Sequence, residues 1–176
     1  MERERGFTLI ELLVTVGIAS LLLFGGVPAL ADFVQAAESR STSLKLVSRF
    51  NLARASAINT GRITTLCGSS DGTRCDRGWD KGILIFTDGG EAGVVDADDR
   101  AIRYDDPVTK GKLRWRVFQN RAYVQFTSMG RSNSLNGNLT YCPSASDGKF
   151  AKKVVVSVTG RVRIAGDSET KEGLSC

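Results

Sequence analysis

Hydrophobic residues are distributed unevenly along the chain, and the longest apolar run lies at its N-terminal end. Residues 7–31 contain one charged side chain, Glu11. As a helix this run would rise about 37 Å at roughly 1.5 Å per residue, enough to cross a hydrocarbon core of about 30 Å. The pattern therefore predicts a membrane-crossing helix over residues 7–31. A carboxylate inside it is costly and indicates a functional role.

The helical pattern continues beyond Pro28, although a proline inside a helix removes one hydrogen bond and kinks it. Over residues 32–60, apolar and small side chains recur at spacings of three and four, which is typical of an amphipathic helix. The predicted buried stripe contains Leu30, Phe33, Val34, Ala37, Ser41, Leu44, Val47, Asn51, Ala55 and Ile58. One helix is therefore expected over about residues 8–59.

Short runs rich in β-branched and aromatic residues follow this helix, separated by Gly, Asp and Asn clusters. We expect strands over residues 62–67, 82–87, 101–104, 113–118, 123–127, 138–141, 153–158 and 161–164. Polar and apolar residues alternate in the fourth run, so Arg114 and Arg116 should share one face of that strand. The expected fold class is α+β, with a long N-terminal helix packed on antiparallel β-sheets.

The opening of the apolar run carries a specific motif. GFTLIEL at residues 6–12 resembles the type III signal sequence of type IV pilins and type II secretion pseudopilins: a charged leader ending in glycine, then phenylalanine, then glutamate as fifth residue of the mature chain. The resemblance implies that residues 1–6 are a prepilin leader peptide. It implies cleavage by the prepilin peptidase between Gly6 and Phe7, and N-methylation of Phe7.

The same resemblance implies a role for Glu11 in filament assembly. In such proteins the glutamate pairs with the α-amine of the methylated phenylalanine of a neighbouring subunit, which neutralises a buried charge. The alternative is that Glu11 has no role in assembly and is tolerated because it lies near the membrane interface. The implied location is a single-pass inner-membrane protein of a Gram-negative bacterium, with a periplasmic domain that later reaches the cell surface in the pilus.

Two other interpretations of the N-terminal segment are an ordinary secretory signal peptide and a plain membrane anchor. Residues 29–31 read Ala-Leu-Ala, an A-x-A cleavage site. Secretory signals, however, have a positive first region and an apolar core of about 7–15 residues. This leader carries two Arg and two Glu, and its apolar run is longer and contains Glu11. The pilin-type helix is favoured, and under any of these interpretations the bulk of the chain is exported.

The globular part, residues 61–176, resembles the FimT/GspH group of minor pilins, which are low-abundance filament subunits. The resemblance begins at the end of the helix and rests on four motifs in order: RASA at residues 54–57, where the helix closes, and then ILIFTD at residues 83–88, FTSMGR at residues 126–131 and VVVSVTGRVR at residues 154–163 in the globular part. It implies other pilins as partners. Members of the group can differ in function. One possible function is DNA binding, which is considered below with the basic region; the alternative is a minor pilin or pseudopilin that primes assembly of a pilus or of a type II secretion pseudopilus and binds no DNA.

Four cysteines, an even number, suit an oxidising periplasm. Their spacing and the absence of histidine argue against a zinc site. Three pairings are possible, and we favour Cys67–Cys75, which closes a short loop, with Cys142–Cys176, which pins the C-terminus. The cysteines are expected to be structural only.

Charge divides the globular part into two regions. Residues 76–106 hold nine acidic and four basic side chains, a net of −5, whereas residues 107–176 hold twelve basic and four acidic side chains, a net of +8. A basic region on an exported protein indicates a surface for a polyanion or an acidic partner. The alternative is a merely soluble surface with some basic excess.

A motif in the basic region predicts a function for its positive charge. GRVR at residues 160–163 resembles the GRxR pattern of FimT proteins used in natural transformation, and that resemblance implies sequence-independent binding of double-stranded DNA by this loop. Gly160 permits a tight turn, and in an extended segment Arg161 and Arg163 fall on one face about 6.6 Å apart, suited to phosphate oxygens. The nearby cations are Lys152, Lys153 and Lys171. The alternative is that such a turn only builds the fold.

Other candidate chemistry is weaker. The acidic side chains Asp88, Glu91, Asp96, Asp98 and Asp99 lack the spacing of an EF-hand, so a solvated acidic turn is favoured over a calcium site. Trp79 and Trp115 are expected to be core or half-buried sheet residues rather than to stack on bases. Without histidine or a nucleophile motif, no enzyme activity, cofactor or metal is expected.

Overall fold

The computed structural model describes residues 6–108, 110–117, 121–133, 136–143, 148–171 and 176. Residues 1–5 of the predicted leader and Phe118, the last residue of a predicted strand, lie outside the described residues. The chain divides into two compact units, Met1–Ala37 and Glu38–Cys176. The first unit is helical from Leu9 onward, and the second contains the remainder of the same helix and all the strands.

Helix α1 (Leu9–Thr60) contains Pro28 in its interior, and its bounds differ by one residue from those predicted. Its start is capped by Thr8, whose hydroxyl oxygen accepts the backbone N–H of Glu11 at 3.3 Å. Thr8 and Glu11 thus occupy the two positions of a T-x-x-E capping box, where a carboxylate also suits the helix dipole. Among the described residues, α1 is the one helix long and apolar enough to cross a membrane.

The face of α1 that is buried in the second unit differs from the predicted stripe. Its buried residues are Ser39, Ser43, Leu46, Phe50, Ala53 and Ala57. In the stripe expected to be buried, Leu44 is 53% exposed and Ile58 is 48% exposed, so that prediction was wrong. Both faces of the helix carry apolar residues. The strands pack against the face whose small Ala and Ser side chains allow them to approach the helix closely around Phe50.

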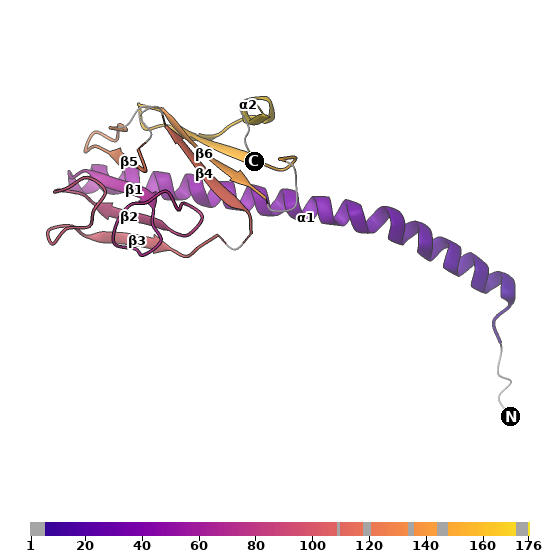
Figure 1. Ribbon diagram of the computed structural model, residues 1–176. Helices are drawn as coiled ribbons and strands as arrows, with labels where there is room; N and C mark the ends of the chain where they lie inside the picture. The colour runs from indigo at the N-terminus through magenta and orange to yellow at the C-terminus, as the bar shows by residue number, and fades with distance from the viewer. Residues whose placement is uncertain (1–5, 109, 118–120, 134–135, 144–147, 172–175) are drawn as a thin grey trace. The chain divides into compact units, whose positions relative to one another are not determined.

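Two four-stranded antiparallel sheets form the rest of the second unit (Figure 1). The first has the order β3-β2-β1-β5 and the second the order β4-β6-β7-β8. The strands are β1 (Thr64–Gly68), β2 (Ile83–Thr87), β3 (Ala101–Asp105), β4 (Lys112–Val117), β5 (Tyr123–Phe126), β6 (Gly137–Cys142), β7 (Lys152–Val156) and β8 (Val162–Ile164). Every predicted strand is present within two residues of its expected bounds. A short helix, α2 (Asp167–Lys171), was not predicted.

The main core lies where the inner faces of both sheets meet the buried face of α1. Three aromatic rings stack at this junction: Phe50 of α1, Trp79 of the loop after β1, and Trp115 of β4, with ring centroids 5.0 to 6.3 Å apart. Trp79 is 1% exposed. Trp115 is partly buried and packs against the core, so the expectation that the tryptophans are core or half-buried sheet residues is confirmed.

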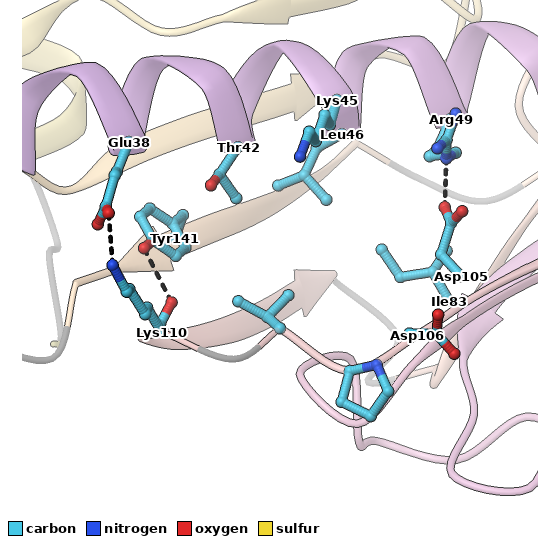
Figure 2. Close-up of a pocket in the computed structure, with 12 residues that line it drawn as sticks. Glu38, Thr42, Lys45, Leu46, Arg49, Ile83, Asp105, Asp106, Lys110 and Tyr141 are labelled. Carbon is cyan, nitrogen blue, oxygen red and sulfur yellow. Dashed lines mark hydrogen bonds and ion pairs between the residues drawn. The ribbon is translucent and has the colours of Figure 1, made fainter.

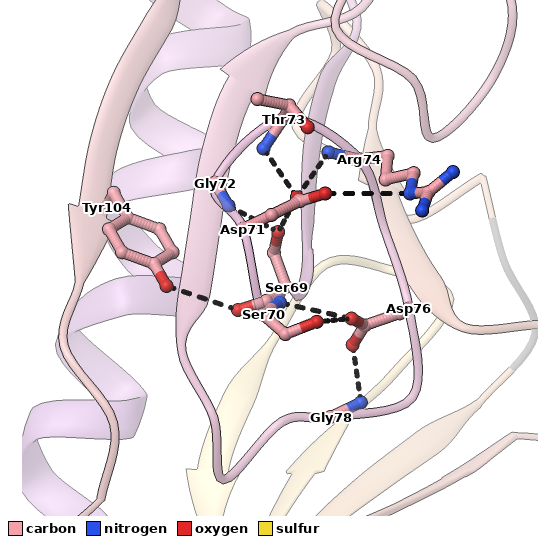
Figure 3. Close-up of polar contacts among 9 residues, drawn as sticks. All are labelled: Ser69, Ser70, Asp71, Gly72, Thr73, Arg74, Asp76, Gly78 and Tyr104. Carbon is pink, nitrogen blue, oxygen red and sulfur yellow. Dashed lines mark hydrogen bonds and ion pairs between the residues drawn. The ribbon is translucent and has the colours of Figure 1, made fainter.

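Both disulfides have the pairing favoured from the sequence, Cys67–Cys75 and Cys142–Cys176. The first closes the loop after β1, and Figure 3 shows two carboxylates organising that loop. Asp71 accepts the backbone N–H groups of Thr73 and Arg74 at 2.9 and 3.2 Å. These bonds, chiefly from Thr73, lower the pKa of Asp71 to about 2. The second disulfide joins the C-terminal residue to β6.

Candidate nucleic-acid interface

The segment that links β7 to β8 is a tight hairpin turn. Ser157 donates its backbone N–H to the carbonyl oxygen of Arg161 at 3.0 Å, and Gly160 donates to the carbonyl of Ser157 at 2.8 Å. Gly160 has a φ of 78°, in the left-handed region. This is the three-residue hairpin in which a left-handed glycine forms a bulge. The structure therefore explains the glycine of the GRVR motif as a requirement of the turn.

A second turn of the same kind lies against the first. Gly130, whose φ is 71°, occupies the matching position in the turn after β5. Its carbonyl oxygen accepts the Nε–H of Arg54 at 2.8 Å, and a Cβ added to Gly160 would lie 1.9 Å from that same oxygen. Ser132 donates its N–H to the carbonyl of Val158 at 3.0 Å. Gly160 is buried in this junction, so any part it has in binding consists of placing Arg161.

The two arginines of the motif are both exposed, while the intervening Val162 is partly buried. The expected alternation of faces is therefore present. Their partners differ. Arg163 donates Nη1 and Nη2 to the two carboxylate oxygens of Glu169, at 2.7 and 2.9 Å. This pair raises the pKa of Arg163 and lowers the pKa of Glu169. The side chain of Arg161 forms no ion pair with any residue in the described ranges.

The lysines predicted near the motif gather around α2. Lys152 donates Nζ to Asp167 Oδ1 at 2.7 Å, an interaction that lowers the pKa of Asp167. Lys153 donates Nζ to the backbone oxygen of Glu169 at 2.5 Å. Lys171 is exposed at the end of α2. The structure thus places these three lysines on or beside α2, which Arg163 also contacts, and it shows acidic partners there that sequence reasoning missed. The available signal was two acids within six residues after the motif.

Strand register extends this basic surface across the whole second sheet. Arg116 on β4 lies in one cross-strand row with Asn138, Val155 and Arg163. Arg114 lies in the neighbouring row with Thr140 and Lys153. Directly paired residues in a sheet share a face, so the cations of β4 point to the same side as Lys153 of β7 and Arg163 of β8. Lys152 pairs with Tyr141 of the core and therefore lies on the other side of β7. The alternation predicted for β4 is confirmed, but its alignment with the motif required the register.

A pocket of about 350 Å³ lies in the second unit between α1 and the strand segments beside it (Figure 2). Glu38 of α1 accepts Lys110 Nζ at 2.7 Å, and the Tyr141 hydroxyl donates to the Lys110 carbonyl at 2.9 Å. The hydrogen bond with Glu38 raises the pKa of Lys110. An ion pair joins Arg49 to Asp105 farther along. Figure 2 shows these two bridges spanning the pocket, so its charged groups hold the helix against the sheets.

The acidic loop after β2 uses its carboxylates internally. Asp88 is buried, and its Oδ2 accepts a threonine hydroxyl of β1, a glutamine amide of β5 and the N–H of Gly93, at 2.5, 3.1 and 3.0 Å. Asp96 and Asp99 accept backbone N–H groups of the loop at 2.8 to 3.0 Å. These side chains therefore order the turn. Among the described residues, no group of acids and cysteines is arranged to hold a metal ion.

Two family descriptions match this chain. "Type II transport protein GspH" matches residues 42–160, and "Prokaryotic N-terminal methylation motif" matches residues 1–27. A curated relative is prepilin peptidase-dependent protein D of Escherichia coli (strain K12), 33% identical over 72 residues, which are 41% of this chain and 49% of the relative. The chain thus spans about half the length of that relative.

Two solved structures have similar folds. Type IV minor pilin FimU of Pseudomonas aeruginosa (strain PAO1) is 19% identical with a TM-score of 0.59, covering 77% of this chain and 94% of that one. Minor pseudopilin EpsH of the type 2 secretion system of Vibrio cholerae is 13% identical with a TM-score of 0.53, covering 73% and 97%. At these identities the likeness establishes the fold, a long N-terminal helix with antiparallel sheets.

Proposed function

The chain belongs to the family of the type II transport protein GspH, and from this premise we propose that it is a minor pilin that binds extracellular DNA for natural transformation. The family and fold are those of minor pilins and pseudopilins of type IV pili or type II secretion. The DNA-binding element is the hairpin between β7 and β8. The observation that carries the proposal is the exposed pair Arg161 and Arg163 on one side of that hairpin.

Processing and location follow from the N-terminal motif. The prepilin peptidase cleaves between Gly6 and Phe7, and Phe7 is then N-methylated. The apolar half of α1 anchors the subunit in the inner membrane with its β-rich unit in the periplasm, and other pilins take the helix into the filament. Glu11 then neutralises the α-amine of a neighbouring subunit. The match to the methylation motif over residues 1–27 and the apolar α1 support this sequence of events.

The chemistry of the hairpin suits a phosphate backbone. A guanidinium presents a planar fork of donors that matches two phosphate oxygens. Arg163 already holds a carboxylate in this bidentate geometry, which supports its capacity for an oxyanion. Contacts to phosphates carry no sequence information, and uptake of arbitrary DNA requires none.

A binding titration tests the proposal. The full-length protein in detergent micelles is mixed with a short DNA duplex of arbitrary sequence at several salt concentrations. We expect weak binding whose log affinity falls with log salt at a slope of about −0.9 for each phosphate contact. The double variant Arg161→Gln with Arg163→Gln should lose most of the binding and about two contacts from the slope.

The matched control removes two arginines beside the acidic loop, Arg62→Gln with Arg100→Gln. It makes the same change in net charge and should weaken binding far less. Undiminished binding by the motif variant, or an equal loss in the control, would remove the hairpin from the mechanism. In cells, the motif variant should reduce transformation while surface pili remain.

A second candidate is a filament subunit that binds no nucleic acid and acts in priming assembly. The observation that favours it is the ion pair between Arg163 and Glu169, because the guanidinium of Arg163 already binds a carboxylate of the same chain and not an external ligand. On this alternative the full-length protein shows no DNA binding at low salt, and deletion of the chain abolishes surface pili together with transformation.

A further inference from the structure

The outer face of the second sheet is cationic from one edge to the other. Its side chains alternate with the core-facing ones, and the cations on it are Lys112, Arg114, Arg116, Lys153 and Arg163. The other described strand positions on this side are Asn138, Thr140, Cys142 and Val155, and none is acidic. At about 4.8 Å between strands, three strand spacings separate β4 from β8 by roughly 14 Å. We call these five cations the basic face.

Helix α2 and Cys176 both contact the basic face, and α2 places a carboxylate on it. The two carboxylate oxygens of Glu169, on α2, accept hydrogen bonds from Arg163, and the backbone oxygen of Glu169 accepts one from Lys153. At the far end, Arg114 Nη2 lies 3.4 Å from the oxygen of Cys176. The Cys142–Cys176 disulfide joins that end to β6, on the same face. Helix α2 therefore meets the sheet at β7 and β8, and Cys176 meets it at β4 and β6.

We propose that the basic face is a binding surface for the phosphate backbone of DNA, and that α2 occupies it as an internal competitor. This inference rests on the proposed DNA-binding function and adds to it. Arg114 and Arg116 become contact residues remote in sequence from the hairpin, and the carboxylate of Glu169 stands where phosphate oxygens bind. Asp167 holds the start of α2 in place through Lys152, beside this surface.

The contacts made by α2 are suited to displacement. The Arg163–Glu169 pair is exposed, with side-chain exposures of 44% and 41%, and in the Lys152–Asp167 pair the carboxylate is 78% exposed. Exposed ion pairs contribute little to stability because water and salt screen them. A polyanion that offers a row of phosphates gains from releasing its counterions at each contact. A short helix with two carboxylates can therefore yield to DNA without unfolding the sheet.

The test compares carboxylate removal on α2 with matched removal elsewhere. Asp167→Asn with Glu169→Gln should tighten binding of the full-length protein to the arbitrary duplex by roughly three- to ten-fold, since two exposed pairs no longer compete. The control, Glu91→Gln with Asp98→Asn, makes the same charge change on exposed residues of the acidic loop and should change affinity by less than about two-fold at moderate salt.

A second pair of variants tests the β4 end of the basic face. Arg114→Gln with Arg116→Gln should weaken binding and lower the salt slope by about two contacts, whereas Arg62→Gln with Arg100→Gln should not. Hydrogen exchange gives a readout that does not depend on affinity: adding DNA to the wild-type protein should increase exchange at the amides of residues 167–171 as α2 is displaced.

The outcomes separate this inference from the function on which it rests. If Arg161→Gln with Arg163→Gln abolishes binding while the α2 variant matches its control and the β4 variant binds like wild type, the hairpin binds DNA and the larger surface is wrong. If neither the wild type nor the α2 variant binds at low salt, both proposals fail. If the α2 variant binds DNA and the wild type does not, α2 acts as a competitor that covers the basic face in the wild-type protein. Slower exchange in residues 167–171 on adding DNA would overturn displacement.

Discussion

The two sheets of this protein differ in how they use their outer faces. Strands β1 and β2 are buried at every position, and the outer side of their sheet carries a small core of its own around Cys67, Leu84 and Phe86. The second sheet has one apolar face on the main core and an outer side that bears the basic face. At β1 and β2, both sides of the first sheet therefore bury side chains that stabilise the fold. One side of the second sheet instead carries charged side chains.

The loops that cover the two sheets explain the difference in charge. The first sheet is covered by the disulfide-closed loop and the acidic loop, whose carboxylates accept hydrogen bonds from their own backbone and from the strands. The second is covered by α2, whose carboxylates meet arginine and lysine side chains near the surface. Acidic groups are therefore bound to backbone and strand groups on one sheet and form exposed ion pairs on the other.

The largest expected effect compares one apolar residue on each outer side. Phe86→Ala, in the buried outer cluster of the first sheet, should lower the free energy of unfolding by about 3–5 kcal/mol because it leaves a cavity. Val155→Ala, on the outer side of the second sheet and partly exposed, should cost roughly 1 kcal/mol. Urea unfolding of the two full-length variants measures both. Equal losses would contradict the distinction between a stabilising side and a binding side.

An intermediate effect concerns the turn that presents the motif arginines. Gly160→Ala combines a φ of 78° with a Cβ 1.9 Å from the Gly130 carbonyl oxygen, so the free energy of unfolding should fall by roughly 3 kcal/mol. Gly61→Ala is the matched control, since its φ is 67° and no atom lies within 4 Å of its added Cβ. It should cost only about 1 kcal/mol. Similar losses would mean that the contact between the two turns is not tight.

The smallest effect is the pH dependence of the cover on the second sheet. The hydrogen bonds from Arg163 hold the pKa of Glu169 below its ordinary value of 4.5. A lowered folded-state pKa stabilises the protein above the unfolded value, and this contribution disappears as pH falls through the folded value. Glu169→Gln should therefore have a slightly lower Tm than the wild type near neutral pH, and the two should converge well below pH 4.5. A gap that persists in acid would show that the glutamine disturbs something other than the ion pair.

The elements of the fold were predictable because their signals are local. A run of 25 residues with one charge indicates an apolar helix, and alternating or β-branched runs between Gly and Asp clusters indicate strands. The hairpin glycine was also recognisable, since its position after a short turn and before a strand requires a left-handed residue. The close pairing of Cys67 with Cys75 followed from the short loop between them.

Other features were not predictable because they depend on partners far away in the chain. The second half of α1 has apolar residues on two sides, and the side around Leu46 and Phe50 was selected by the strands that pack there. The basic face needed the register that aligns Arg116 with Arg163. Helix α2 has five residues, too few for a periodic signal.

The amino-acid sequence by itself determined the long apolar helix, the positions of the strands along the chain and the segregation of negative from positive charge, since each is a property of neighbouring residues. Only the tertiary structure decided which side of the helix is covered, which arginines share a surface and which carboxylates meet them. Those outcomes depend on strand pairing and on contacts between residues far apart in the chain, such as Lys153 with Glu169 and Arg114 with Cys176.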